Sequence, residues 1–255
     1  MALGGVFMSD TDGNIGTNST TSTEKVTGLL FDISKQAKFF EEGAGLAVKD
    51  KLQGNVIEIN SMDDLKELGI AAPSDDPKND LLFGVPYYHI NHFFSIQGDN
   101  GRLFIMFANC GADWNAIDQM QHAAHGMINQ LGVWTEQSLW KQTDPEAGTY
   151  SIDLVADLQS KASSLADENA PLSILLNANS AVIATSDEPV KKVELAKIPT
   201  CITNARFVTV LLSQGLDKDV SAMQLANPNL TPVGNIGAAL GCVALASVQE
   251  SFAWV

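Results

Sequence analysis

The residues in this sequence best suited to chemistry are its four histidines, which fall into two HxxH pairs. His89 and His92 form the first pair, and His122 and His125 form the second. Residues i and i+3 of an α-helix share a face, so each pair can present two imidazoles to one metal ion. Neither pair contains the glutamate that acts as general base in HExxH zinc enzymes. We therefore interpret the rings as parts of amphipathic helices or of subunit contacts, and expect no bound metal.

A glycine-rich stretch, residues 234–241, is the second candidate, because backbone N–H groups in such loops can bind phosphate. Its spacing matches neither GxGxxG nor GxxxxGK[ST], and the Asn- and Pro-rich segment before it indicates a loop rather than a strand. We interpret it as a helix whose small residues let another backbone pack closely. The sequence also lacks a GxSxG motif, and no histidine follows His125 to act as base for Ser213. These patterns predict no catalytic residue and no cofactor.

The composition indicates a folded protein with a strong acidic excess. Charged residues make up 18% of the chain, and the net charge of −15 disfavours binding to nucleic acid or to anionic membranes. The longest apolar run, residues 236–248, is shorter than the roughly 20 residues that a membrane-spanning helix needs. The N-terminus lacks the features of a signal peptide. With three widely spaced cysteines, the chain is expected to be made in a reducing cytoplasm and not to insert into a membrane.

Short apolar runs that indicate buried strands alternate with segments of helical periodicity. This alternation predicts an α/β fold, with a doubly wound, mixed but mainly parallel sheet and helices on both faces. Residues 71–80 and 141–149 are expected to be loops. No linker clearly divides the core, and the loop 141–149 is only a weak candidate for a domain boundary. The expected strands are 26–33, 56–59, 102–108, 130–135, 172–176 and 207–212. The expected helices are 35–41, one capped by Ser61 and ending at Gly69, one opened by Pro86, one capped by Asp113 and running to His125, 151–165, and 235–246.

The first 24 residues differ from the rest in composition. They are rich in Gly, Ser, Thr and Asn, and residues 10–23 contain almost nothing to bury. Such a segment cannot offset its own ordering entropy. We therefore expect residues 1–24 to be an extended N-terminal arm and residues 25–255 to be the α/β core.

The C-terminal residues 231–255, TPVGNIGAALGCVALASVQESFAWV, resemble a segment of contractile tail-sheath proteins. The pattern is VG-x-x-GA-x-LG-x-x-A-x-A-x-V-x-ES-x-x-WV, and it is most similar to a divergent sheath group of phage and phage-like injection systems, formerly a domain of unknown function. Residues 206–215 resemble the strand and loop that precede this segment, and residues 4–6 and 26–31 resemble the family's arm and first core strand. Residues 60–200 match only in their general α/β pattern. The matching positions are Val233, Gly234, Gly237, Ala238, Leu240, Gly241, Ala244, Ala246, Val248, Glu250, Ser251 and Trp254.

The resemblance implies a structural role rather than an enzyme. Sheath subunits form hexameric rings that stack helically around an inner tube on a baseplate, and contraction drives the tube through a target envelope. The subunits would be made in the cytoplasm and assembled into a virion tail or a phage-like particle. Terminal arms add strands to neighbouring sheets, which fits the composition of residues 1–24. The resemblance implies that inter-subunit contacts are made by Gly4, Val6, Phe7 and Ile15.

In the family, more chain, including a C-terminal arm, follows this segment. Here the sequence stops at Trp254 and Val255, within an apolar run, so we expect a core truncated before that arm. Two alternatives stay open. One is another virion or baseplate assembly protein, which neighbouring genes would separate from a sheath. The other is a nucleotide- or metal-dependent α/β enzyme, which its ligand would stabilise against heat.

Overall fold

The computed structural model describes a little over half of the chain. The segments expected to form the N-terminal arm, with Gly4, Val6, Phe7 and Ile15, and the helix 35–41 lie outside the described residues. Within the part that is described, no helix has the length and apolarity needed to cross a bilayer. The described residues are 26–34, 51–70, 72, 77–98, 101–110, 113–135, 137, 141–144, 149–151, 153–177, 206–211 and 233–245.

A six-stranded sheet with the order β2-β3-β1-β4-β7-β8 forms the centre of the fold. Only β2 is antiparallel to its neighbour, and the remaining pairs are parallel. Numbered along the chain, the parallel strands have the order 2-1-3-4-5, one of the two common doubly wound arrangements. The mixed, mainly parallel sheet expected from the sequence is therefore confirmed. Its strands are β1 (Val26–Asp32), β2 (Val56–Ile59), β3 (Arg102–Ala108), β4 (Gln130–Trp134), β7 (Ser173–Asn177) and β8 (Val208–Leu211).

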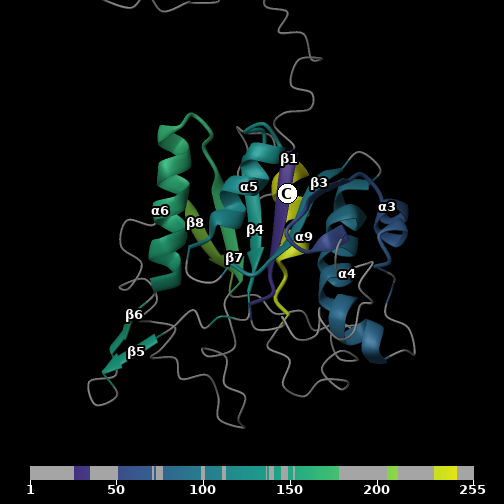
Figure 1. Ribbon diagram of the computed structural model, residues 1–255, viewed down its shortest axis with the longest axis horizontal. Coiled ribbons are helices and arrows are strands. Elements are labelled where there is room, and N and C mark those ends of the chain that lie inside the picture. The colour runs from purple at the N-terminus through teal and green to yellow at the C-terminus, as the bar shows by residue number, and fades with distance from the viewer. Residues whose placement is uncertain are drawn as a thin grey trace, which may run out of the picture.

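Helices cover both faces of this sheet and produce three layers (Figure 1). Successive residues of a strand point to opposite faces, so Leu29 and Phe31 of β1 enter one core while Val26 and Leu30 enter the other. The first core is closed by α3 (Met62–Glu67), α4 (Pro77–Gln97) and α9 (Ile236–Leu245). The second core is closed by α5 (Asn115–Ala123) and α6 (Asp153–Asp167).

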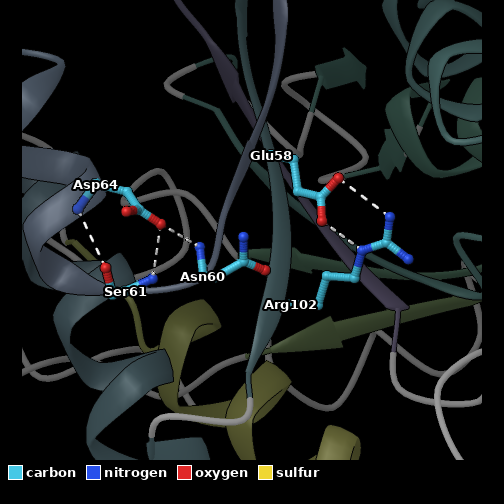
Figure 2. A network of polar contacts seen from close by, with 5 residues as sticks. All are labelled: Glu58, Asn60, Ser61, Asp64 and Arg102. Atoms are coloured by element: carbon cyan, nitrogen blue, oxygen red, sulfur yellow. Dashed lines mark hydrogen bonds and ion pairs between the residues drawn. The ribbon is translucent and has the colours of Figure 1, made fainter.

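The helix α3 begins as the sequence predicts. Ser61 is its N-cap, and the Ser61 hydroxyl accepts a hydrogen bond from the backbone N–H of Asp64 at 3.2 Å. The Asp64 carboxylate accepts in return from the backbone N–H groups of Asn60 at 2.7 Å and Ser61 at 3.1 Å (Figure 2). The Asn60 N–H, followed by the Ser61 groups, holds the pKa of Asp64 below its usual value despite slight desolvation. This reciprocal capping box satisfies donors that the first turn would otherwise leave free.

The start of α4 corrects two sequence predictions. The helix begins at Pro77 rather than at Pro86, so residues 77–80 are helical and not part of a loop. Proline is favoured at the first helical position, where its missing N–H costs nothing. Pro86 lies inside the helix, where proline removes one hydrogen bond. We attribute its tolerance to the burial of the following turns, because Tyr88, Ile90 and Phe93 all lie in the first core.

Two further elements depart from the predictions. The segment expected as a loop, residues 141–149, contains an antiparallel hairpin of β5 (Lys141–Asp144) and β6 (Thr149–Ser151), which lies apart from the main sheet below α6 (Figure 1). Its short strands carry no run of large apolar residues, the signal by which the other strands were predicted. The N-cap position of α5 is Trp114, with a left-handed φ of 52°, and not Asp113. Asp113 still reaches the first turn, because its carboxylate accepts from the Asn115 N–H at 3.3 Å.

Candidate functional site

Polar side chains gather at the carboxyl edge of the sheet, where the parallel strands end. Asp32 is the last residue of β1, and 1% of its surface is exposed. Strand β1 lies between β3 and β4, so the chain crosses from one side of β1 to the other at this edge. In doubly wound proteins ligands bind at such a switch point. The surroundings of Asp32 therefore decide whether this edge can hold a ligand.

The Asp32 carboxylate accepts five hydrogen bonds from the protein itself. Its Oδ1 accepts from the backbone N–H groups of Ser34 at 3.0 Å and Cys110 at 3.2 Å. Its Oδ2 accepts from the Ser34 hydroxyl at 3.0 Å, the Thr135 hydroxyl at 2.7 Å and the Gln137 amide at 2.7 Å. A carboxylate offers about four lone-pair positions, so these donors use its acceptor capacity. Asp32 thus joins the ends of β1, β3 and β4, and leaves no oxygen available to bind a cation or accept a substrate proton.

Asn177 extends this network to β7. Its Oδ1 accepts from the Thr135 backbone N–H at 2.9 Å, and its Nδ2 donates to the Thr135 carbonyl at 3.2 Å. Asn177 and Thr135 are both buried away from water. The two hydrogen bonds between them therefore replace bonds that these groups would otherwise make to water. The sequence analysis missed this network. A sequence pattern could have indicated it, because a polar residue stands at the end of three buried strands. These residues are Asp32, Thr135 and Asn177.

Cys110 lies beside the same network, but it is not a reactive thiol. Its side chain is buried, and its Sγ–H donates to the Ala108 carbonyl at 3.7 Å. Burial, followed by the negative charges of Asp32 and Asp113, raises the pKa of Cys110 far above its usual value. Because the thiolate is the nucleophile and the metal ligand, Cys110 stays protonated and inert at neutral pH.

The helix α9 lies against α4 through glycines that leave no room for a side chain. A Cβ at Gly237 would overlap with the backbone of His89, including its carbonyl oxygen. A Cβ at Gly241 would lie 2.9 Å from Ile96 and 3.2 Å from the Phe93 carbonyl oxygen. The glycine-rich stretch is therefore a helix that another backbone approaches closely, as the sequence analysis predicted.

The sheet is adapted to α9 in the same way. Gly132 in β4 lies under the helix, and a Cβ there would come within 2.5 Å of Ile236 and 2.6 Å of Leu240. The Gln97 amide, at the end of α4, donates to the Gly241 carbonyl at 2.6 Å. Residues from α4 and β4 thus form a closely packed surface against which α9 lies in the first core.

The N-terminus of α9 and the turn before it are held by three hydrogen bonds to two elements, α4 and β4. The Tyr88 hydroxyl donates to Asn235 Oδ1 at 3.0 Å, and the indole N–H of Trp134 donates to the Val233 carbonyl at 3.2 Å. The backbone N–H of Gly237 donates to His89 Nδ1 at 3.4 Å. This end of α9 lies beside the carboxyl edge of the sheet, because Trp134 is the last residue of β4.

The two HxxH pairs lie on opposite faces of the sheet. His89 is buried on α4, and burial, followed by the neighbouring His92, lowers the pKa of His89 to about 3. His122 and His125 are exposed at the end of α5, which covers the second core. The fold therefore separates the candidate metal ligands into two places. Within the described part of the chain, no three His, Cys, Asp or Glu side chains are grouped so that they could hold a metal ion.

Comparison with solved structures gives a distant likeness. No family model and no curated protein matches the sequence. Among solved structures, the chain is similar to the helical sheath of the anti-feeding prophage in its contracted state, determined by cryo-EM. The likeness covers 98% of this chain and 54% of that chain, with 12% sequence identity and a TM-score of 0.45. The chain thus spans about half the length of that sheath chain, and a likeness of this degree carries no argument about function.

Proposed function

We propose that this chain is a structural subunit of a contractile tail sheath. It polymerises with copies of itself, as hexameric rings stacked in a helix around an inner tube, and it drives that tube through a target envelope. Its further partners are the tube and baseplate proteins, and its destination is a virion tail or a phage-like particle. No catalytic step is part of this function.

The observation that carries the proposal is the place of the sheath-like residues in the fold. Of the positions that resemble the family, those between residues 233 and 245 form α9 and the turn before it. Gly237 and Gly241 lie where a side chain would meet α4, and Leu240 is fully buried. The resemblance thus falls on residues that this fold requires, which supports a shared architecture rather than a chance likeness of composition.

The edges of the sheet support assembly through added strands. In the described residues, β2 and β8 each pair with one strand only. On β2, the Glu58 carboxylate forms a bidentate ion pair with Arg102 of β3 (Figure 2). The Arg102 Nε donates to Oε1 at 2.5 Å and Nη2 donates to Oε2 at 3.1 Å. Charged residues on an edge strand discourage pairing with another chain. The four residues of β8, VTVL, contain no charge, so β8 is the edge we assign to an incoming strand.

Hydrogen-bond alternation identifies which backbone groups of β8 would receive that strand. The Ile174 N–H of β7 donates to the Phe207 carbonyl at 2.7 Å, and Ile174 is paired with Val208. In a parallel pair the same side of the strand is used by every second residue, so Thr209 also faces β7. Val208 and Val210 then direct their N–H and C=O groups outward.

This alternation gives a test with a matched control. Val210→Pro removes one outward N–H and leaves the bonds to β7 in place, whereas Val210→Ala keeps that N–H. We expect Val210→Pro, and likewise deletion of residues 1–24, to leave a folded core with a normal melting transition and to abolish helical polymers in electron micrographs. The Val210→Ala protein should still polymerise. Polymers formed normally by both the proline variant and the arm deletion would refute assembly by strand addition at β8.

A further inference from the structure

His89 is a fully buried histidine whose ring lies where three elements meet. It belongs to α4, its ring centroid is 6.3 Å from that of Phe31 in β1, and its Nδ1 accepts from Gly237 in α9. Its other nitrogen, Nε2, is buried and has no partner of good hydrogen-bond geometry among the described residues. The Val233 carbonyl, which accepts from the Trp134 indole, also lies near the ring and favours its protonated form, but this effect is smaller than that of burial. A buried polar atom left in this way is costly and calls for an explanation.

The hydrogen bond from Gly237 determines the protonation state of the ring. Nδ1 acts as an acceptor, so the imidazole is neutral and carries its proton on Nε2. Gly237 is the second residue of α9, and the N–H groups of a first helical turn have no partner within the helix. His89 therefore acts as a cap for α9, provided by a different helix 148 positions away along the chain.

A proton on Nδ1 would remove this cap and oppose the helix. The protonated nitrogen is a donor and would face the Gly237 N–H, which is also a donor. The new positive charge would lie at the N-terminus of α9, where the helix dipole is already positive.

Among the described residues around His89, no negative charge offsets this effect. The titratable groups that face His89 from α4 are Tyr88 and His92, with ring centroids of Tyr88 and His89 5.2 Å apart. From β1 the neighbour is Phe31, while the adjacent Asp32 accepts its hydrogen bonds from Ser34, Cys110, Thr135 and Gln137. The helix α9 and strand β4 contain no Asp, Glu, Lys, Arg or His.

The geometry points to His89 as an acid-sensitive cap, which keeps α9 docked on α4 while the imidazole is neutral and releases it when the imidazole takes up a proton. This device belongs to the single chain and does not depend on the proposed assembly. It would make the docking of the segment that carries the sheath-like residues conditional on pH.

The direction and size of the pH effect follow from linkage. The pKa of His89 is about 3 with α9 docked and 6.5 in a solvated reference state, so the undocked state binds the proton more tightly. Docking is therefore fully stable above pH 6.5 and is weakened as the pH falls below that value. Between pH 7.5 and pH 5.5 the equilibrium constant for opening should rise about tenfold.

Hydrogen exchange on the full chain measures this opening. We expect the protection factors of residues 236–245, corrected for the intrinsic exchange rate at each pH, to fall about tenfold between pH 7.5 and 5.5. The matched variants are His89→Asn, which keeps an acceptor near the position of Nδ1 but does not titrate, and His122→Asn, which removes the exposed histidine of the other HxxH pair. His89→Asn should reduce the pH effect to less than twofold, and His122→Asn should behave as the wild type.

A second readout keeps the test decisive if His89→Asn fails to fold. In NMR spectra of the wild type, the ring signals of His89 should not titrate between pH 7.5 and 5.5. A folded-state titration of His89 near pH 6.5 would overturn the inference. Unchanged protection of residues 236–245 in the wild type, or an equal fall in the His89→Asn protein, would overturn it as well.

Discussion

The two faces of the sheet are covered by helices that pack according to different physical rules. On the first face, α9 meets α4 and β4 by close backbone approach at Gly237, Gly241 and Gly132, and α9 itself carries no charge. On the second face, α5 and α6 pack through larger side chains such as Leu158, and are joined by an ion pair between Lys161 and Asp118 at 2.7 Å. The second face is an ordinary amphipathic layer. The first is a close backbone contact of α9 with α4 and β4, at Gly237, Gly241 and Gly132, which we call the joint.

This difference determines which changes each face tolerates. A backbone contact at a glycine is broken when atoms are added, because neither backbone can move aside without moving its helix. A side-chain layer is damaged mainly when atoms are removed, because a cavity remains. The HxxH pairs follow the same division, since one pair includes a histidine enclosed by the joint and the other lies exposed on the amphipathic layer.

The largest effect is expected from adding one methyl group to the joint. Gly237→Ala places a Cβ against the His89 carbonyl, and should lower the free energy of unfolding by more than about 3 kcal/mol. At an open helical position the same change would stabilise by up to about 1 kcal/mol. Urea denaturation measures both this variant and Gly241→Ala, whose closest contacts are less severe and whose loss should be smaller. Equal stability of Gly237→Ala and the wild type would show that the joint is not tightly fitted.

The second face should respond to loss of volume instead. Leu158 is fully buried between α6 and the sheet, and Leu158→Ala should lower the free energy of unfolding by about 3 kcal/mol. The exposed Leu245, 43% accessible, is the matched control, and Leu245→Ala should change the stability by less than about 0.5 kcal/mol. A Leu158→Ala protein as stable as the Leu245→Ala control would contradict the side-chain packing described for this face.

The carboxyl edge joins the two faces, and its network should have an intermediate effect. Asp32→Asn replaces one acceptor oxygen with an NH₂ group that faces donors from Thr135 and Gln137. The unsatisfied donors should lower the free energy of unfolding by about 2 kcal/mol, measured by urea denaturation. Asp113→Asn, at an exposed carboxylate, is the control and should cost well under 1 kcal/mol, on the order of other surface changes. A neutral Asp32→Asn would indicate that Asp32 does not hold the strand ends together.

The smallest effect is expected at the ion pair of the second face. Asp118 is 46% exposed, so Lys161→Met should cost less than about 1 kcal/mol in physiological buffer. Salt screens exposed charges, and the difference from the wild type should vanish at about 1 M salt, where the Debye length is about 3 Å. A loss that persists at high salt would mean that the aliphatic part of Lys161, and not its charge, links α5 to α6.

The sequence was sufficient to predict most of the sheet, because its signals are local. The run VTGLLFDI and the strand 102–108 consist mainly of apolar residues, as expected for strands covered on both faces. The glycine spacing likewise indicated the close packing of α9. Local signals failed where the structure depends on context, as at Pro86, whose cost is offset by burial of the rest of α4, and in the polar hairpin of β5 and β6.

The candidate site was less predictable, because it is made by contacts between distant residues. Asp32 bonds Thr135 and Gln137 across more than 100 positions of sequence, and no local pattern indicates that these side chains meet. The histidine pairs show the same limit. His89 and His122 occupy the same position in the same motif, yet one is enclosed by α9 and the other is solvent-exposed.

The central claim, that this chain is built to polymerise, is tested most directly by electron microscopy of the purified full chain over a range of protein and salt concentrations. Salt matters because copies of net charge −15 repel one another, and screening removes this barrier. We predict helical tubes or stacked rings of constant diameter that become more abundant as protein and salt concentrations rise. Uniform single particles of monomer size under every condition would contradict the account.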